Sequence, residues 1–415
     1  MDGPAALLPI ETIEQARDQI REQCFSASGV GRVGLECEWH VFDVADEQRI
    51  VPLEVVDQLV AGIGPLPAGS RVTFEPGGQL ELSSPPAVGV EAACDALAAD
   101  HDVVAAGLAP FGLALVANGC DPVRPPVRQL RRPRYDAMEA FFDCDGPAGR
   151  RMMCRTAALQ INVDIGTEPE AERRWRLAHL LGPVLSAAFA TSPLAEGRPS
   201  GWASTRLATW LAIDPTRTAA VGGGRDAFVS YALDANVMLV RRDGRFVPMR
   251  DRLSFGSWIR CGHALGAPTP DDLEYHLTTL FPPVRPRRWL ELRYLDALPD
   301  PWWRVAAAVV TALLDDPDAG DVAEAAARQV ADRWCDAARC GLADPAIQLA
   351  AAQCVASARQ AFGRLGISHR MAAVCDAFIE RYLARGRTIG DDVLYDWRAG
   401  RPLVPTPDPG EDRWT

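Results

Sequence analysis

The hydrophobic and polar positions of the chain alternate with a period of two in four separate stretches. The four stretches, each followed by its polar residues in parentheses, are 34–42 (Glu36, Glu38, His40), 74–84 (Gln79, Glu81, Ser83), 159–165 (Gln160, Asn162, Asp164) and 289–294 (Glu291, Arg293). Hydrophobic side chains take the intervening positions. Because successive side chains of a strand point to opposite faces, this pattern predicts four half-buried β-strands, each with an acidic or amide-bearing face.

In the second stretch the alternation begins directly after a tight turn, Pro76-Gly77-Gly78. Glu75 precedes the turn and Glu81 follows it, so the chain reversal can bring two carboxylates together. Carboxylates are depleted in strands, which makes this composition typical of a site. An amphipathic hairpin with a solvated face would show the same alternation.

Apolar residues at helical spacing, or alanine-rich stretches, cover much of the remaining chain. They predict helices at residues 10–29, 53–62, 90–109 and 177–190, a buried strand at 112–117, and a helical region from 302 to 385. Asp243-Gly244 predicts a hairpin turn.

We find no repeat and no strong linker, so we expect one catalytic domain of residues 1–415. It would comprise a sheet-rich core (30–300), a helical C-terminal layer (301–390) and a tail (400–415).

The composition limits the classes of function. A chain of 415 residues with 48% hydrophobic and 24% charged residues is globular. Its net charge of −12 argues against a nucleic-acid partner. The sequence contains no lysine, a bias that GC-rich coding explains. Schiff-base chemistry and a phosphate-loop lysine are therefore excluded, and any phosphate must be bound by arginine, metal ions or backbone amides.

The cysteines and the apolar runs indicate in which cellular compartment the protein is expected. The eleven cysteines include no C-x-x-C pair and no zinc-like spacing, which favours free thiols in a reducing environment. No basic segment typical of a secretory signal is found near Asp2, and the longest apolar run, residues 105–117, is interrupted by Pro110. We expect a soluble cytoplasmic protein without a membrane partner.

A basic segment lies between the second and third strands. Residues 124–134 carry five arginines and three prolines, which predicts an extended loop. Its arginines Arg128, Arg131, Arg132 and Arg134 would either attract an anionic substrate or simply be solvated. The solvated alternative is the simpler one.

The four acidic strand faces together indicate an enclosed polar cavity. If they converge, Glu36, Glu38, Glu75, Glu81, Gln160 and Glu291 supply hard oxygen ligands. So many carboxylates in one cavity would repel one another and take up protons unless cations were present. Oxygen ligands favour Mg²⁺ or Mn²⁺ over zinc. Arg293, beside Glu291, would then neutralise a transferring phosphoryl group, although an ion pair on a solvated sheet would look the same.

Several motifs resemble those of glutamate-cysteine ligases of the plant and proteobacterial type. They are Gly34-Leu35-Glu36-Cys37-Glu38, residues 74–83, Arg155-Thr156 with Gln160-Ile161-Asn162-Val163-Asp164, Ser192-Pro193 with Glu196-Gly197, Tyr231-Ala232-Leu233-Asp234, residues 276–282 and Leu290-Glu291-Leu292-Arg293. They occur in the family's order between about residues 30 and 315. One departure is Arg241-Arg242, where the plant type carries lysines.

This resemblance implies an α+β fold similar to glutamine synthetase, with an antiparallel sheet curled into a funnel and helices around it. It also implies that ATP phosphorylates the side-chain carboxylate of L-glutamate and that the amine of L-cysteine then displaces the phosphate. The six oxygen ligands named above would hold roughly two or three Mg²⁺ ions, with Mn²⁺ as a substitute. Glu291 and Arg293 would be catalytic, and Arg155, Arg206, Arg217 and Asn162 would bind substrate.

The lysine-free composition favours the actinobacterial branch of the family, whose product feeds ergothioneine. Alternatives are a role in the glutathione pathway, a glutamate ligase for another amine, and a catalytically silent regulatory relative. A ligase for another amine would keep the same metal and phosphate residues, whereas the presence of all the acidic ligands argues against an inactive relative.

Overall fold

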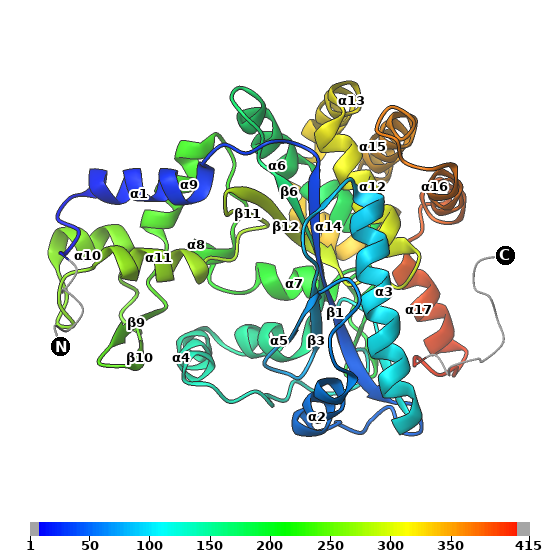
Figure 1. The fold of residues 1–415 in the computed structure, drawn as a ribbon, viewed down its shortest axis with the longest axis horizontal. Helices are drawn as coiled ribbons and strands as arrows, with labels where there is room; N and C mark the ends of the chain where they lie inside the picture. The colour runs from blue at the N-terminus through cyan, green and yellow to red at the C-terminus, as the bar shows by residue number, and fades with distance from the viewer. Residues whose placement is uncertain (1–7, 405–415) are drawn as a thin grey trace.

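An antiparallel sheet organises the fold (Figure 1). The computed structural model describes residues 8–404, so part of the predicted tail, residues 405–415, lies outside the described residues. Within the described range eight strands form this sheet. They are β1 (Arg32–Asp43), β2 (Arg71–Phe74), β3 (Leu80–Ser83), β4 (Ala87–Val88), β5 (Leu113–Val116), β6 (Ala158–Asp164), β11 (Val284–Pro286) and β12 (Trp289–Asp296). All four acidic strands predicted from the sequence are confirmed, as β1, β3, β6 and β12.

The strand order makes these four strands direct neighbours. The sheet runs β11-β12-β6-β1-β3-β2, with β4 and β5 paired to β1 outside this path. Its register aligns Glu36 with both Gln160 and Ser83, and Glu38 with Glu81. Glu291 is aligned with Asn162. Because aligned residues of neighbouring strands point to the same face, the polar positions form one continuous row across the sheet.

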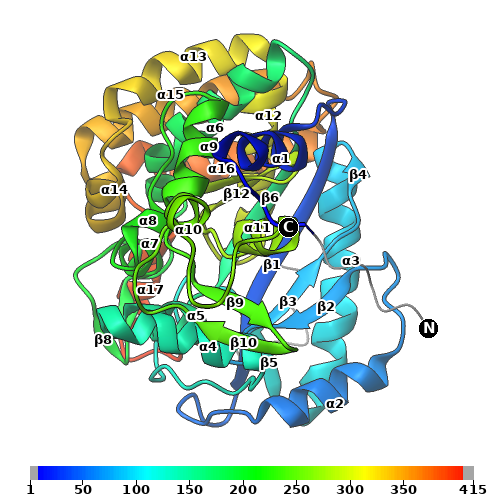
Figure 2. The same cartoon turned by 90° about the vertical axis from the view of Figure 1, so that its left-hand side faces the viewer.

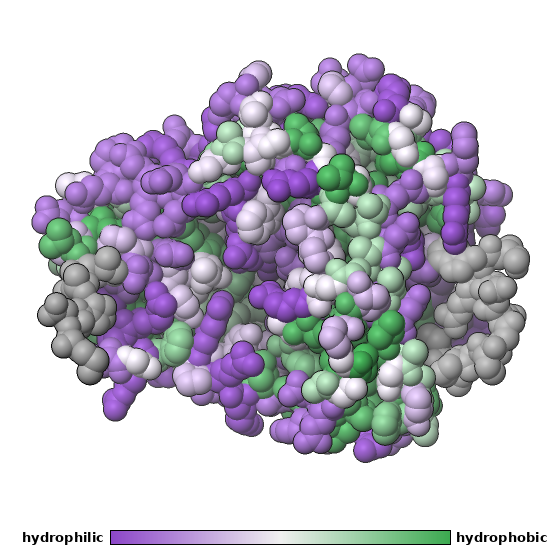
Figure 3. Space-filling model, viewed as in Figure 1, coloured by the Kyte–Doolittle hydropathy of each residue, from purple (hydrophilic) through white to green (hydrophobic). Residues whose placement is uncertain are grey.

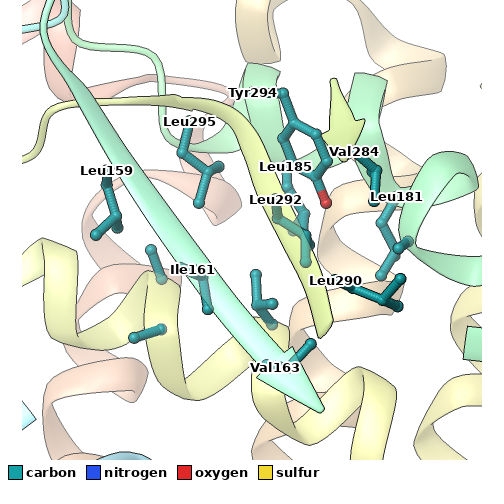
Figure 4. Packing of buried hydrophobic residues seen from close by; sticks show 14 of the residues in the cluster. Leu159, Ile161, Val163, Leu181, Leu185, Val284, Leu290, Leu292, Tyr294 and Leu295 are labelled. Carbon is teal, nitrogen blue, oxygen red and sulfur yellow. The ribbon is translucent and has the colours of Figure 1, made fainter. Parts of the chain in front are cut away.

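The opposite face of the sheet is the core of the molecule. Figure 4 shows Leu159, Ile161 and Val163 of β6 packed beside Leu290 and Leu292 of β12. Three helices cover this face, α3 (Val90–Leu108), α6 (Glu170–Ala188) and α12 (Trp302–Asp315). Each fully buried leucine of this layer contributes about 1.5–3 kcal/mol. Burial of these leucines therefore favours the orientation in which the polar residues of the strands point away from the helices.

The polar face of the sheet looks toward a second group of short elements (Figures 1 and 2). These and the other elements outside the C-terminal layer are α1 (Ile13–Phe25), α2 (Leu53–Ile63), α4 (Pro133–Phe142), α5 (Ala148–Arg155), β7 (Leu194–Ala195), β8 (Arg198–Pro199), α7 (Thr205–Leu211), α8 (Pro215–Thr218), α9 (Arg225–Asp234), β9 (Leu239–Arg242), β10 (Arg245–Pro248), α10 (Phe255–Cys261) and α11 (Pro270–Thr278). The predicted hairpin turn is confirmed, since Asp243 and Gly244 join β9 to β10 with φ angles of 50° and 72°.

The basic segment differs from its prediction in two ways. The loop ends at Arg132, and α4 begins at Pro133, because proline is well suited to the first position of a helix. Arg124 and Arg128 are not solvated. Arg124 donates from Nε to Asp121 at 2.7 Å, and Arg128 lies 2.6 Å from Asp136. Arg131 and Arg132 are exposed as expected.

The predicted helical layer at the C-terminal end is observed. It contains α12, α13 (Pro317–Ala327), α14 (Trp334–Cys340), α15 (Pro345–Ala361), α16 (His369–Arg381) and α17 (Ile389–Arg398). Short 3₁₀ helices lie at Ala109–Phe111, Asp143–Asp145, Arg328–Val330, Gly341–Ala343 and Leu383–Arg385. The small alanine side chains let these helices approach α6 closely. At Gly182 a Cβ atom would lie 1.9 Å from the ring of Trp334, so that crossing requires glycine.

Three further features are the exposed hydrophobic residues, the state of the cysteines and the hydrophobicity of the helices. On the face drawn in Figure 3, hydrophobic residues gather near α2 and α3, where Val55, Val103 and Phe111 are exposed. All eleven cysteines are free thiols, as the sequence predicts. Within residues 8–404, no helix combines the length and the hydrophobicity needed to cross a membrane.

Candidate active site

The polar row of the sheet carries three carboxylates from adjacent strands β1 and β3. Glu36 accepts a hydrogen bond from Asn162 Nδ2 at 3.0 Å. Glu38 accepts from the backbone N–H of Ala158 at 2.8 Å and from Gln160 Nε2 at 3.2 Å. Glu81 accepts from the hydroxyl of Thr73 at 2.5 Å. The strand pairing thus places predicted ligands from β1, β3 and β6 side by side, and Gln160 and Asn162 of β6 donate to the two glutamates of β1.

The turn before β3 adds Glu75 to this group. The N–H of Glu75 donates to the carbonyl of Gln79 at 2.9 Å, and the N–H of Gly78 donates to the carbonyl of Glu75 at 2.8 Å. Gly78 has a φ of 90°, and a Cβ on Gly77 would lie 2.2 Å from the carbonyl oxygen of Cys154. Both glycines are therefore required for the turn to pack on α5 and hold Glu75 beside the row.

Four of the carboxylates have raised pKa values. Burial raises the pKa of Glu36 to about 7, with further increases from Glu291 and Glu81. The pKa of Glu38 is raised well above its ordinary value by burial and then by Glu75 and Glu81. Burial is also the main cause of the raised pKa values of Glu75 and Glu81. The row therefore holds more negative charge than its protein neighbours neutralise.

Glu291 differs from these four because arginines neutralise it. Burial alone would raise its pKa, but Arg285 and then Arg293 outweigh that effect and lower it to about 2. Arg285 donates from Nε at 2.7 Å and from Nη2 at 2.8 Å, one bond to each carboxylate oxygen. Arg293 donates from Nη1 to Glu291 and to Gln160 Oε1. Arg293 thus links β12 to the carboxylate row.

The donor set fits a hard divalent cation in its chemistry. The predicted ligands offer only oxygen atoms, and the raised pKa values of four carboxylates indicate that a cation is favoured there. In the described residues, no three His, Cys, Asp or Glu side chains are already arranged around a common metal position. The carboxylates of Glu36, Glu38, Glu81 and Glu291 accept hydrogen bonds from neighbouring protein groups instead. Glu291 is the least suited of the six, because two arginines already occupy its carboxylate.

Two of the predicted substrate arginines are buried, one beside Arg293 and the other in the wall of a separate cavity. Arg206, on α7, is 2% exposed and donates from Nη2 to the carbonyl of Arg293 at 2.7 Å. Arg155, at the end of α5, is 3% exposed and pairs with Glu196 at 2.8 Å. It lines a cavity of about 540 Å³ together with Arg151 and Arg198. Asn162 lies in the row itself.

Arg217 does not join this group. Arg217 belongs to α8, and its completely buried side chain donates to Thr279 and to the backbone carbonyl of Asn236. Its guanidinium also lies 5.1 Å from the ring centre of Phe141. These contacts connect three chain segments, and the substrate-binding role of Arg217 stays a prediction.

Sequence reasoning missed some neighbours of the row. Arg285 is the most important, because β11 and β12 form a hairpin whose register aligns Arg285 with Glu291, and this register is known only from the structure. Thr73, which binds Glu81, comes from β2. Trp289 donates its indole N–H to Asn162 Oδ1 at 2.8 Å. The short strands β2 and β11 carry no strong alternation, which explains why they were overlooked.

Comparison with known proteins identifies the family. The model of "Glutamate-cysteine ligase family 2" matches residues 32–394, so the chain belongs to this family and the predicted resemblance is confirmed. The chain is 43% identical over 402 residues to "Glutamate--cysteine ligase EgtA" of Mycolicibacterium smegmatis, covering 92% of this chain and 95% of that protein. It is 44% identical over 395 residues to the protein of the same name from Mycobacterium tuberculosis, covering 89% and 90%.

A solved structure shares the fold. The glutamate-cysteine ligase of Francisella tularensis, in complex with AMP, has a TM-score of 0.57 over 91% of this chain and 87% of that chain. Sequence identity is 12%, so this similarity concerns the fold alone. The predicted α+β class, an antiparallel sheet with surrounding helices, is confirmed.

Proposed function

We propose that this protein is an ATP-dependent ligase that joins the side-chain carboxylate of L-glutamate to the amine of L-cysteine. The observation that carries this proposal is the row of buried and half-buried carboxylates with raised pKa values, ending at Arg293, in a member of this ligase family. The similarity to two proteins named glutamate-cysteine ligase supports the choice of substrates. The AMP complex of the Francisella protein supports a nucleotide site.

The reaction follows from the chemistry of a carboxylate. A carboxylate has no leaving group, so the γ-phosphoryl group of ATP is first transferred to the glutamate side chain, releasing ADP. The amine of cysteine then attacks the acyl carbon, a proton leaves the nitrogen, and phosphate departs as γ-glutamylcysteine forms. No protein nucleophile is required. The absence of lysine from the sequence is compatible with both steps.

The residues of the row have separate roles in this proposal. Glu36, Glu38, Glu75, Glu81 and Gln160 would hold the Mg²⁺ ions, and Glu291 would join them only if an arginine moved aside. Bound Mg²⁺ would spread the charge that develops on the transferred phosphoryl group. Arg293 would stabilise the same charge by donating from its guanidinium. Arg155, Arg206 and Asn162 would orient the amino-acid substrates, while Arg217 would hold the surrounding wall.

We further propose that the whole chain acts as one catalytic domain and that its product supplies ergothioneine. One cluster of buried apolar residues includes side chains of the sheet and of the C-terminal helices, which supports a single domain. The lysine-free composition and the similarity to the two EgtA proteins support the pathway.

The deciding experiment is mass analysis of the product formed from glutamate, cysteine and Mg-ATP. Formation of γ-glutamylcysteine with one ADP per product supports the proposal, and exclusive use of a non-thiol amine contradicts it.

Arg293→Ala should lower kcat about 10²–10³-fold, since Arg293 would stabilise the transferred phosphoryl group. Arg401→Ala, which removes an exposed arginine paired to Asp396, is the matched control.

A further inference from the structure

The cavity of about 540 Å³ that Arg155 borders lies between α5, α7 and the hairpin of β7 and β8. Its lining takes in positions 205, 208 and 209 of α7 and position 212 just after it, which is one face of that helix. Arg206, which donates to the carbonyl of Arg293, is not part of this lining. The cavity is large enough for a small organic molecule. The function proposed above assigns it no ligand.

The charges on the lining are unbalanced. The charged residues of the cavity are Arg151, Arg155, Arg198 and a single acid, Glu196. Within residues 8–404 the exposed side chains of Arg151 and Arg198 form no ion pair and no hydrogen bond. The side chain of Arg155 is 3% exposed, and its carboxylate partner Glu196 is 46% exposed. In a chain with a net charge of −12 this cavity is locally positive, which favours an anion.

The hairpin wall of the cavity is held by contacts from outside the hairpin. Its turn places Glu196 and Gly197 at φ angles of 52° and 74°, a conformation that is unfavourable for glutamate. The N–H of Gly197 donates to the carbonyl of Pro122 at 2.8 Å, and the carbonyl of Gly197 accepts from the indole N–H of Trp397 at 3.0 Å. Glu196 also pairs with Arg155 at 2.8 Å. These contacts stabilise the turn, so the wall is formed before any ligand binds.

The rest of the lining is uncharged. Trp202 and several alanines supply an apolar surface, and Ser200 and Thr205 supply hydroxyl groups. A carbon skeleton would contact the apolar part, while oxyanion groups would accept hydrogen bonds from the arginines. Arginine binds carboxylates and phosphates through two parallel N–H donors, which suits either group. The lining therefore fits an organic anion better than a bare inorganic ion.

We propose that this cavity binds a small organic anion with at least two negative charges, and that Arg151 and Arg198 hold its carboxylate or phosphate groups. Neither arginine has a part in the function proposed above, and the inference does not depend on that function. Arg155 is shared with the proposed function. The variants that test the cavity therefore change Arg151 and Arg198 and leave Arg155 in place.

The test is titration calorimetry with citrate and, separately, with glycerol 3-phosphate, in buffer that contains EDTA. EDTA removes the cations through which an anion would bind the carboxylate row. Tighter binding of citrate indicates a polycarboxylate ligand, and tighter binding of glycerol 3-phosphate indicates a phosphate ester. Arg151→Ser combined with Arg198→Ser should raise the Kd of the tighter anion about 10- to 100-fold, because charge-assisted hydrogen bonds are lost. Added NaCl should weaken the same binding.

Arg328→Ser combined with Arg381→Ser is the matched control. It removes the same charge from two exposed arginines that do not line the cavity, so the Kd should stay close to that of the unaltered protein. Both double variants should keep the KM values for glutamate, cysteine and ATP.

Three results would overturn the inference. They are binding of neither anion by the unaltered protein, equal Kd values for the two double variants, and a raised KM for a substrate in the Arg151 and Arg198 variant, which would assign the cavity to that substrate. Citrate binding by a protein that forms no γ-glutamylcysteine would contradict the proposed function and support the cavity.

Discussion

Replacing Arg285 by alanine should destabilise the folded chain by about 3 kcal/mol. The change removes two hydrogen bonds, at 2.7 and 2.8 Å, from a carboxylate whose side chain is 1% exposed. Breaking a buried ion pair by removing one partner costs about 3–5 kcal/mol. We expect the lower end of that range, because Arg293 continues to donate to Glu291.

This energy corresponds to a measurable shift in melting temperature. An unfolding entropy of about 2.1 cal/mol/K per residue gives roughly 0.9 kcal/mol/K for a chain of this length, so Tm should fall by about 3–4 °C. The assay is thermal unfolding followed by circular dichroism near neutral pH. Arg287→Ala is the matched control, because Arg287 is an exposed arginine two residues away whose guanidinium lies 5.5 Å from the Trp289 ring. Arg287 also lowers the pKa of Glu291, but less than Arg285 and Arg293 do, so Arg287→Ala should lower Tm by less than Arg285→Ala.

Two further measurements test the reasoning. The folded pKa of Glu291, about 2, is below its ordinary value of 4.5, so the stability from this group is complete above pH 4.5 and is lost as the pH falls toward 2. The difference between Arg285→Ala and the unaltered protein should therefore shrink as the pH falls below 4.5. The double variant Arg285→Met with Glu291→Leu should be more stable than Arg285→Ala. Equal Tm values for Arg285→Ala and Arg287→Ala would refute the argument.

The remaining predictions concern the carboxylate row and its turn. The folded pKa of Glu36, about 7, is above its ordinary value of 4.5, so in metal-free buffer its contribution to stability is lost as the pH rises from 4.5 through 7. Thermal melts in EDTA should show a weaker dependence on pH for Glu36→Gln, and a slope as steep as that of the unaltered protein would contradict the assignment. Added Mg²⁺ should raise Tm more at about pH 8 than at about pH 5.5, because the carboxylates must lose protons to bind it. Gly77→Ala should lower both Tm and kcat, since its Cβ would lie 2.2 Å from the Cys154 carbonyl oxygen, whereas Gly62→Ala, with nothing within 4 Å of its Cβ, should preserve both.

Much of the fold was predictable from local patterns. The alternation at residues 34–42 predicted β1 because a strand with one buried face must alternate, whatever its neighbours are. The Asp243-Gly244 turn was predictable for a similar reason, since few residues accept two consecutive positive φ angles. The start of α4 at Pro133 was missed, because proline fits both a loop and the first turn of a helix.

The sequence predicted which residues belong to the candidate site better than it predicted the contacts between them. The motifs pointed to Glu36, Glu81 and Arg293 before any strand pairing was known. Arg285 was missed because its importance depends on the register between β11 and β12. The resemblance also predicted Arg217 as a substrate residue, and this stays a prediction; in the structure Arg217 donates hydrogen bonds to Thr279 and Asn236.

The sequence by itself determined the four alternating strands, the class of ligands they carry and the family, because these properties depend on the order of residues along the chain. Only the tertiary structure decided that β12, β6, β1 and β3 are neighbours, and that Glu291 is neutralised while Glu36 is not. The physical reason is that strand pairing and burial arise between segments far apart in sequence. The charge state of a carboxylate depends on which atoms surround it, and those atoms are brought together only by folding.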